Sequence, residues 1–201
     1  MGKSKIYVNG KLLAEHFGGY LPVVVDVTDA LEFGKENLIA VWADNSNDPN
    51  YPPGKQQEVL DFTYFGGIYR DCWLIAHNQV FITDPNYENE EAGGGLFVAY
   101  NNVSDHSAEV LLKIQIRNSG RKAFKGVVEY ELQQPDGQQV ASLNSVIRIK
   151  PGKSTYSSDK LTVKSPMLWS PENPALYNLI VRIRDEKGNP IDGYRRRIGI
   201  R

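Results

Sequence analysis

Hydrophobic and polar residues alternate with a period of two along most of the chain, in short runs rich in β-branched and aromatic residues. The runs end at Gly, Pro, Asn or Asp, which are common in turns, so the pattern predicts an all-β protein. The clearest predicted hairpin has strands at 6–8 and 11–14. Asn9 and Gly10 lie between them and suit a type I′ turn, in which both central residues take a positive φ.

Three more strands are predicted in the first part of the chain, at 22–27, 37–43 and 71–76. Between the first two, the residues at 27–33 predict a short helical turn with Thr28 as its N-terminal cap.

The second part of the chain predicts a separate β-sandwich. From residue 96 onward about seven strand-like runs follow in roughly 100 residues, which is the count and spacing of an immunoglobulin-like sandwich. The acidic, glycine-rich stretch TDPNYENEEAGGG precedes them and is typical of a connector. We therefore predict a domain boundary near Ile82, with domains at 1–82 and 83–201.

Composition narrows the classes of partner. The 201 residues include 23 Lys and Arg against 24 Asp and Glu, with no long basic block, so no nucleic-acid partner is expected. No apolar run approaches the roughly 20 residues of a membrane helix, and the N-terminus lacks the apolar region of a signal peptide. A soluble protein without a membrane partner is expected, and its compartment stays open.

Metal and cofactor chemistry has little support in the sequence. The one cysteine, Cys72, excludes an internal disulfide and a cysteine-based metal cluster within one chain. The three histidines lie far apart, without the spacing of metal ligands. We therefore expect neither a metal nor another cofactor.

The stretch DFTYFGGIYRD at 61–71 is unusually rich in aromatic, charged and glycine residues. Gly66 and Gly67 predict a tight turn or a close backbone approach that a Cβ would not tolerate. Arg70 and Asp71 are expected to form hydrogen bonds or an ion pair that fastens this loop.

Several motifs in this order resemble family 2 glycoside hydrolases, particularly the β-galactosidases. The resemblance covers nearly the whole chain and is carried by VNGKLLAEHFGGYLPVVVDVTDAL, ENLIAVWADNS, DFTYFGGIYRDCWL, LWSPENPALYNLIVRI and RRIGIR. It implies part of a sugar-binding jelly roll at 1–82, followed by an immunoglobulin-like domain. It also implies a TIM barrel that follows these domains in the family and holds both catalytic carboxylates. The sequence is therefore expected to be a piece of a longer enzyme.

The resemblance separates recognition from catalysis. Retaining glycoside hydrolysis needs two carboxylates roughly 5 Å apart, and no residue here corresponds to either, so no catalytic residue is expected in this chain. Asp61 stands where the β-galactosidases of the family have an aspartate that binds galactosyl hydroxyls in the assembled active site. The competing interpretation is that Asp61 only stabilises the turn.

Three other residues are singled out with less specificity. Asn45 begins the polar loop 45–55, which either lines the mouth of a sugar cleft or is simply solvated. Tyr64 either stacks on a sugar or packs within the protein. Trp169 in LWSPENPALY is expected to pack into the core of the second domain.

Two functional hypotheses remain open. In the first, the chain is a non-catalytic accessory region of a retaining glycosidase that supports the TIM barrel and meets a β-galactoside-type carbohydrate through the full-length enzyme. In the second, it is a self-standing carbohydrate-binding module. A half-complete jelly roll would also leave an unpaired sheet edge, which favours a homo-oligomer.

Overall fold

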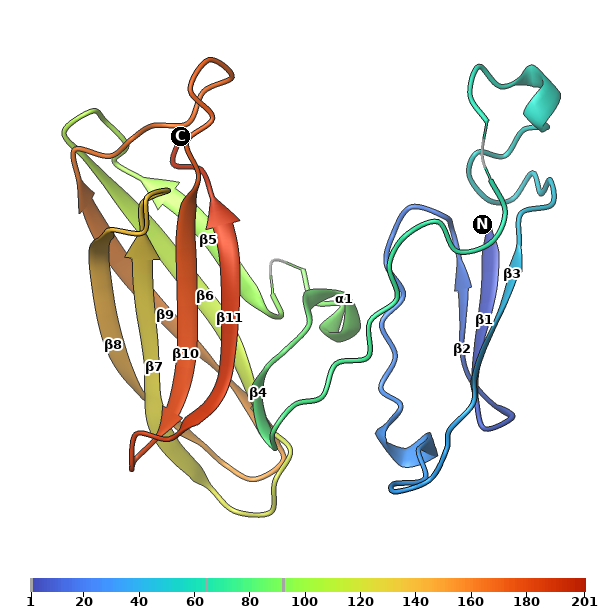
Figure 1. Cartoon of the computed structure of the whole chain (residues 1–201), viewed down its shortest axis with the longest axis horizontal. Coiled ribbons are helices and arrows are strands. Elements are labelled where there is room, and N and C mark those ends of the chain that lie inside the picture. Colours follow the sequence, from blue (N-terminus) through green and yellow to red (C-terminus); the bar gives the residue numbers. More distant parts are fainter. Residues whose placement is uncertain (1, 64, 92) are drawn as a thin grey trace. The chain divides into compact units, whose positions relative to one another are not determined.

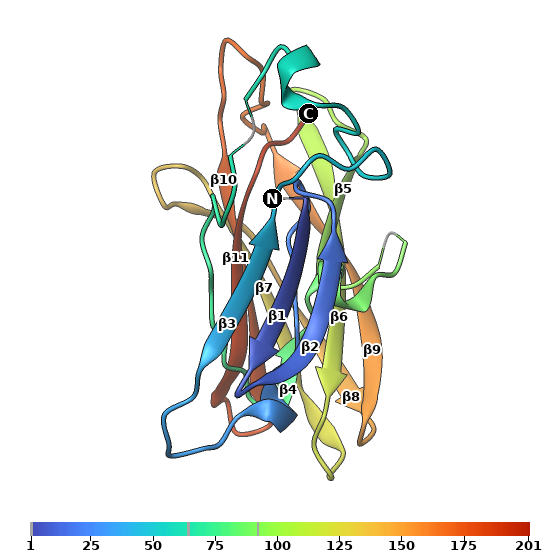
Figure 2. The same cartoon turned by 90° about the vertical axis from the view of Figure 1, so that its right-hand side faces the viewer.

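A computed structural model describes residues 2–63, 65–91 and 93–201, without the side chain of Gln57. The chain forms two compact units, Met1–Ile75 and Ala76–Arg201, and both are built from antiparallel strands (Figures 1 and 2). The predicted all-β class is confirmed. The boundary between the units precedes the one expected near Ile82.

The first unit contains a three-stranded antiparallel sheet in the order β2-β1-β3. Its strands are β1 (Lys3–Val8), β2 (Lys11–Phe17) and β3 (Ile39–Asp44). The predicted hairpin is confirmed, because Asn9 has φ 50° and Gly10 has φ 81°, as a type I′ turn requires.

Two predicted strands of the first unit do not form. Neither 22–27 nor 71–76 joins a sheet within the described part of the chain. An alternating pattern favours an extended chain, but a strand also needs a partner for its backbone hydrogen bonds. The predicted helical turn is the short 3₁₀ helix η1 (Thr28–Ala30), and the residue that accepts its hydrogen bonds is Asp26 rather than Thr28. Asp26 Oδ1 lies 2.9 Å from Thr28 N and 2.6 Å from Thr28 Oγ1.

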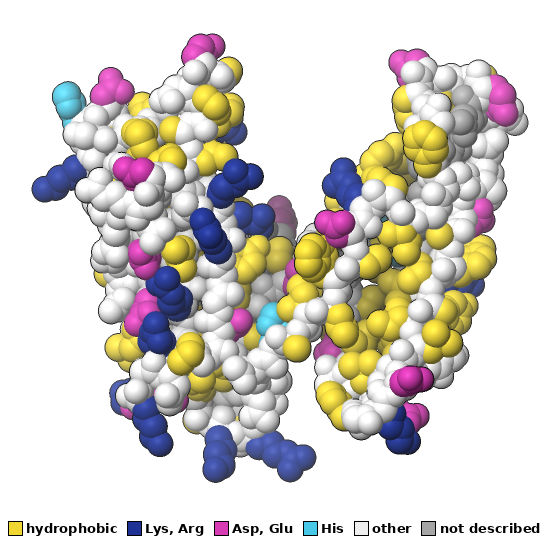
Figure 3. Space-filling model, in the orientation of Figure 1, with side chains coloured by type: hydrophobic (Ala, Val, Ile, Leu, Met, Phe, Trp, Pro, Cys, Tyr) yellow, Lys and Arg dark blue, Asp and Glu magenta, His cyan; other side chains and the backbone are white. Residues whose placement is uncertain are grey.

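Large apolar side chains are exposed on the first unit, as the yellow areas of Figure 3 show. Trp42 on β3 is 47% exposed, and Trp73 and Leu74 are 80% and 70% exposed. Single exposed apolar residues are ordinary, but many large exposed apolar side chains on one unit indicate a surface that binds another molecule.

The second unit is a sandwich of two antiparallel sheets. In one sheet β6 (Ser107–Asn118) pairs with β4 (Val80–Ile82), β5 (Leu96–Asn101) and β9 (Lys153–Lys164). The other sheet has the order β11-β10-β7-β8. Its strands are β7 (Phe124–Gln133), β8 (Gln139–Ile149), β10 (Tyr177–Asp185) and β11 (Pro190–Ile198). The two-sheet architecture agrees with the predicted immunoglobulin-like sandwich.

The core of the second unit lies between its two sheets. Alternate residues of the central strands point inward, so Val110 of β6 and Leu179 of β10 are fully buried while their sequence neighbours are not. Tyr130 of β7 and Tyr177 of β10 are the largest buried side chains.

The acidic, glycine-rich segment before β5 is fastened to the second unit. It contains the one-turn helix α1 (Pro85–Glu88), whose N-terminal amides donate to the carboxylate of Asp84. The buried hydroxyl of Thr83 donates to Gln115 Oε1 at 2.8 Å and accepts from Gly95 N at 2.9 Å. β4 and the residues that follow it are therefore integrated with β6.

Among the described residues, no helix combines the length and apolar character needed to span a bilayer.

Candidate functional site

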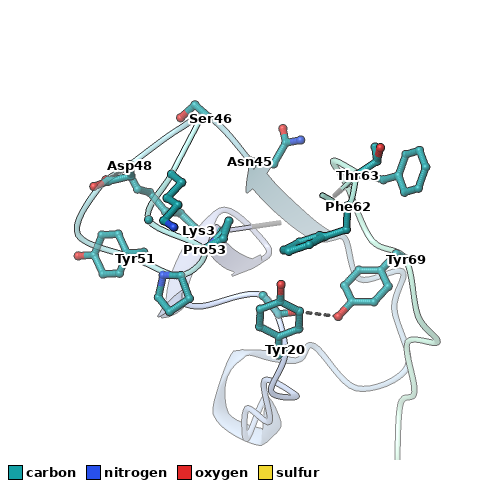
Figure 4. Close-up of a pocket in the computed structure, with 16 residues that line it drawn as sticks. Lys3, Tyr20, Asn45, Ser46, Asp48, Tyr51, Pro53, Phe62, Thr63 and Tyr69 are labelled. Atoms are coloured by element: carbon teal, nitrogen blue, oxygen red, sulfur yellow. Dashed lines mark hydrogen bonds and ion pairs between the residues drawn. The ribbon is translucent and has the colours of Figure 1, made fainter. Parts of the chain in front are cut away.

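A cavity of about 210 Å³ opens in the first unit (Figure 4). Four segments line it: the start of β1, the residues that follow β2, the loop 45–55 after β3, and the region 62–69. The cavity is smaller than the roughly 300–1,000 Å³ typical of drug-sized ligands, which suits a single small ring.

An ion pair fastens the loop 45–55 at one side of the cavity. Lys3 Nζ lies 2.5 Å from Asp48 Oδ2 and 5.7 Å from the centroid of the Tyr51 ring, which stacks on Phe17. The hydrogen bond between Lys3 and Asp48 raises the pKa of Lys3. The same bond, together with one from the backbone amide of Asn50, lowers the pKa of Asp48. The loop is polar, as expected, but it is tied to the sheet.

Aromatic rings form another part of the wall. Figure 4 shows Tyr20, Phe62 and Tyr69 around one end of the cavity, with exposed fractions of 63%, 47% and 49%. Tyr69 is fixed because its hydroxyl donates to the carbonyl of Gly19 at 2.7 Å. These rings leave apolar faces open to a ligand and bring polar groups near them.

Asn45 joins this wall and is placed by the double glycine. It directly follows the last residue of β3 and lines the cavity. A Cβ on Gly66 would come within 3.0 Å of Asn45 Oδ1, so the predicted close approach occurs there. Gly67 has φ +75°, so the predicted turn conformation that favours glycine is found at this second position.

The other residues of DFTYFGGIYRD lie less centrally. Asp61 is exposed and is not among the described residues that line the cavity, although its neighbour Phe62 is. Tyr64 lies outside the described residues. Arg70 and Asp71 are both exposed.

Arg70 and Asp71 were expected to form hydrogen bonds or an ion pair that fastens the loop, and neither takes part in an ion pair within the described part of the chain. The Arg70 guanidinium instead lies 5.5 Å from the centroid of the Tyr69 ring. A cation over the face of an aromatic ring is a favourable contact.

Trp169 takes a position at the margin of the second unit. It is only partly buried and does not belong to the cluster of buried core residues. Its backbone N–H donates to the carbonyl of Ile200 at 2.8 Å. Its side chain lies 3.0 Å from the position that a Cβ on Gly199 would take. The guanidinium of Arg201 lies 5.5 Å from its ring centroid. Trp169 thus packs on the terminal segment rather than within the core.

Sequence reasoning missed Tyr20 and Lys3 as cavity residues. Tyr20 directly follows the double glycine Gly18-Gly19, just as Phe65 directly precedes the double glycine of the motif. An aromatic residue next to a double glycine was therefore a signal that could have found Tyr20. Lys3 offers no such signal, because its role depends on the loop that folds onto it. Among the described residues, no group of three or more His, Cys, Asp or Glu is placed to hold a metal ion.

The family is decided by the second unit. The model of the family described as "Glycosyl hydrolases family 2" matches residues 95–201, which is more than half of the chain. The chain belongs to this family.

Relatives in this family match almost the whole chain. A putative beta-glucuronidase of Formosa agariphila is 35% identical over 98% of this chain, and a beta-galactosidase of Thermoanaerobacter pseudethanolicus is 31% identical over 98%. The chain spans 21% and 24% of their lengths.

Solved structures support the same assignment. The crystal structure of a Bacteroides uniformis beta-glucuronidase matches 99% of this chain with a TM-score of 0.85 at 30% identity, and the chain covers 23% of it. A putative beta-galactosidase from Bacteroides fragilis matches 100% of this chain with a TM-score of 0.85 at 30% identity, and 29% of it is covered. The chain therefore corresponds to less than a third of these larger proteins.

Proposed function

We propose that this chain is a non-catalytic region of a retaining family 2 glycosidase that contributes to recognition of a terminal β-galactosyl residue. The observation that carries the proposal is the small cavity of the first unit, where open aromatic rings meet the amide of Asn45 beside the DFTYFGGIYRD motif. A sugar ring has an apolar face and a rim of hydroxyls, and this wall offers a partner for each.

Each polar group has a distinct part in this proposal. The amide of Asn45 can accept from one hydroxyl and donate to another. The carboxylate of Asp61 can accept from two hydroxyls, and hydrogen bonds to a charged acceptor are stronger than neutral ones. Asp61 meets the sugar at the rim, outside the described lining of the cavity.

Catalysis is assigned to a separate domain. Retaining hydrolysis uses an acid/base carboxylate and a nucleophilic carboxylate roughly 5 Å apart, which a TIM barrel of the longer enzyme would supply. The role of this chain is then to hold part of the sugar and to support that domain. The exposed apolar residues of the first unit, including Trp42 and Trp73, favour such a supporting role because they suit contact with further protein.

Two alternatives are kept because particular observations favour them. The Formosa protein named above is a putative beta-glucuronidase and the Bacteroides uniformis protein is a beta-glucuronidase, which favours a β-glucuronoside as the sugar. The open cavity within one compact unit favours a self-standing carbohydrate-binding module.

A two-dimensional NMR titration of this chain with galactose, glucuronate and mannose tests these readings. We expect shifts with galactose at Asn45, Tyr20 and Tyr69, and their loss in Asp61→Ala and in Asn45→Ala. Asp71→Ala is the matched control, because Asp71 is an exposed carboxylate of the same motif outside the described lining. Larger shifts with glucuronate would favour the glucuronoside instead. The absence of shifts at millimolar sugar would remove the recognition role and leave only the supporting one.

A further inference from the structure

The outer face of the sheet β11-β10-β7-β8 carries arginines on two neighbouring strands, and those on β10 are paired with carboxylates of β7. Arg182 Nη1 lies 2.7 Å from Glu131 Oε2, and Arg184 Nε lies 2.8 Å from Glu129 Oε2. Figure 3 shows basic side chains along this face of the second unit with acidic ones among them. The charges of β10 are therefore balanced within the sheet.

Arg195 and Arg197 of β11 share this face, and the one carboxylate in their rows, Glu131, is already bonded to Arg182. Arg195 lies opposite Ile180 and Arg197 lies opposite Asn178, so the next strand offers Glu131 and Gln133 in the same rows. Glu131 already accepts from Arg182 and from Gln133 Nε2. No ion pair of Arg195 or Arg197 with a carboxylate occurs among the described residues.

Arg195 is held in place by a neutral partner. Its Nε and Nη2 donate to Asn178 Oδ1 at 3.2 and 2.9 Å. Both arginines line one shallow, open hollow together with Leu176, Asn178 and Arg196. The guanidinium of Arg196 donates to the hydroxyl of Tyr194 at 2.9 Å. An arginine has five N–H donors, so Arg195 keeps donors for a ligand while its orientation is already fixed.

We propose that this hollow binds the carboxylate of an acidic saccharide, that is, of a uronic-acid unit. Two guanidinium groups without an internal counter-charge suit a planar carboxylate, which accepts parallel N–H bonds from an arginine fork. The amide nitrogen of Asn178 is available for a neighbouring hydroxyl. The site lies in the second unit, and it is independent of the cavity beside Asn45.

A polypeptide partner fits this hollow less well. Energetically important contacts between proteins are enriched in aromatic residues at a dehydrated centre, and Leu176 is the apolar member of this lining. An open, strongly basic hollow matches a charged group on a polar ligand.

The test uses the whole chain with four probes: trigalacturonate, neutral galactotriose, galactose 6-sulfate and a polyglutamate peptide. We expect trigalacturonate to shift the amides of 176–178 and 195–197, galactotriose to leave them unchanged, and added salt to weaken the binding. Arg195→Gln with Arg197→Gln should raise the Kd at least about tenfold, since a lost charge-assisted hydrogen bond is worth roughly 1.5–3 kcal/mol.

Arg148→Gln is the matched control. Arg148 is exposed on the same face of this sheet but on β8, opposite Lys125, so its loss removes one positive charge, as each single substitution of the double variant does, without touching the hollow. Equal weakening by Arg148→Gln would show general charge attraction and overturn the site. Stronger binding of the sulfate ester, equal binding of a polyglutamate peptide, or an unchanged Kd in the double variant would each overturn the assignment to a uronate.

Discussion

Asn45 and Gly66 are in direct contact, and this contact joins the loop after β3 to the DFTYFGGIYRD motif. A Cβ on Gly66 would lie 3.0 Å from Asn45 Oδ1 and 3.2 Å from Asn45 Nδ2. The missing side chain at position 66 therefore sets where the amide of Asn45 lies in the cavity wall. The second glycine serves a different purpose, because nothing lies within 4 Å of a Cβ on Gly67 and its φ is +75°.

Gly66→Ala and Gly67→Ala should therefore differ in their effects. Alanine at 66 must displace the amide of Asn45 by a few tenths of an ångström, so we expect shifted side-chain amide signals of Asn45 and weaker galactose binding. Alanine at 67 must adopt a left-handed conformation, which costs about 1–2 kcal/mol of stability, with the Asn45 signals unchanged. NMR spectra and urea unfolding of both variants separate the two effects. Identical spectra around Asn45 in both would contradict this account.

Tyr69→Phe tests the hydrogen bond that fixes the aromatic wall. The substitution keeps the ring but removes the bond from the Tyr69 hydroxyl to the Gly19 carbonyl. Because Tyr69 is half exposed, we expect a loss of at most about 1 kcal/mol in the free energy of unfolding. Faster hydrogen exchange should appear at 18–20. Tyr20→Phe is the control, since no hydrogen bond of its hydroxyl is found in the described part of the chain, and it should leave exchange there unchanged.

The Lys3–Asp48 pair should make the loop 45–55 sensitive to pH at both extremes. Asp48 has a lowered pKa through Lys3, so its contribution is present above its ordinary value of 3.8 and is lost as the pH falls through the lowered value. Lys3 has a raised pKa through Asp48, so its contribution is present below 10.5 and is lost as the pH rises through the raised value. The loop amides should therefore change little between these limits.

Asp48→Asn should remove the part of the acid transition that belongs to this pair. Asp44 keeps its own lowered pKa through the hydrogen bond from the backbone of Ser46, so a smaller transition should persist in the variant. Chemical shifts of the loop amides across the pH range measure both parts. An acid transition of full size in Asp48→Asn would show that the pair does not hold the loop.

Local sequence patterns predicted the elements that depend on local geometry. The hairpin around Asn9 and Gly10 was predictable because a type I′ turn demands particular residues. The strands of the second unit were predictable because one face of each is buried and the alternation is strong. The strands expected at 22–27 and 71–76 did not form, because pairing depends on a neighbour that a local pattern cannot supply.

The site was predictable in part for the same reason. The glycines at 66 and 67 signal a special backbone, and Asn45 signals a polar loop, but their mutual contact joins segments that are distant in sequence. Arg70 shows the converse, since a hydrogen bond or an ion pair was expected for it and the contact found is with the ring of its neighbour Tyr69. Contacts between loops follow from the assembled sheet.

Two buried tyrosines in the second unit should respond oppositely to the loss of their hydroxyls. Tyr130 and Tyr177 are 1% and 0% exposed. The hydroxyl of Tyr177 accepts from Met167 N at 2.7 Å. No described residue meets hydrogen-bond geometry with the hydroxyl of Tyr130, although Ser157 and Asp159 lie near enough to influence its pKa, and the hydroxyl of Ser157 already donates to Asp159. Burial raises the pKa of the Tyr130 phenol, which keeps it neutral.

Tyr130→Phe should therefore leave the free energy of unfolding unchanged or raise it by up to about 1 kcal/mol, because it removes a buried polar group without a partner. Tyr177→Phe should lower it by about 1–3 kcal/mol, because the amide of Met167 would lose its acceptor. Both changes keep the ring, so the packing of the core is nearly the same in each variant. Urea unfolding with a common m-value compares them directly. If the two variants lose equal stability, the hydroxyl of Tyr130 does have a partner, and the interior between β7 and β9 is more fully hydrogen-bonded than described.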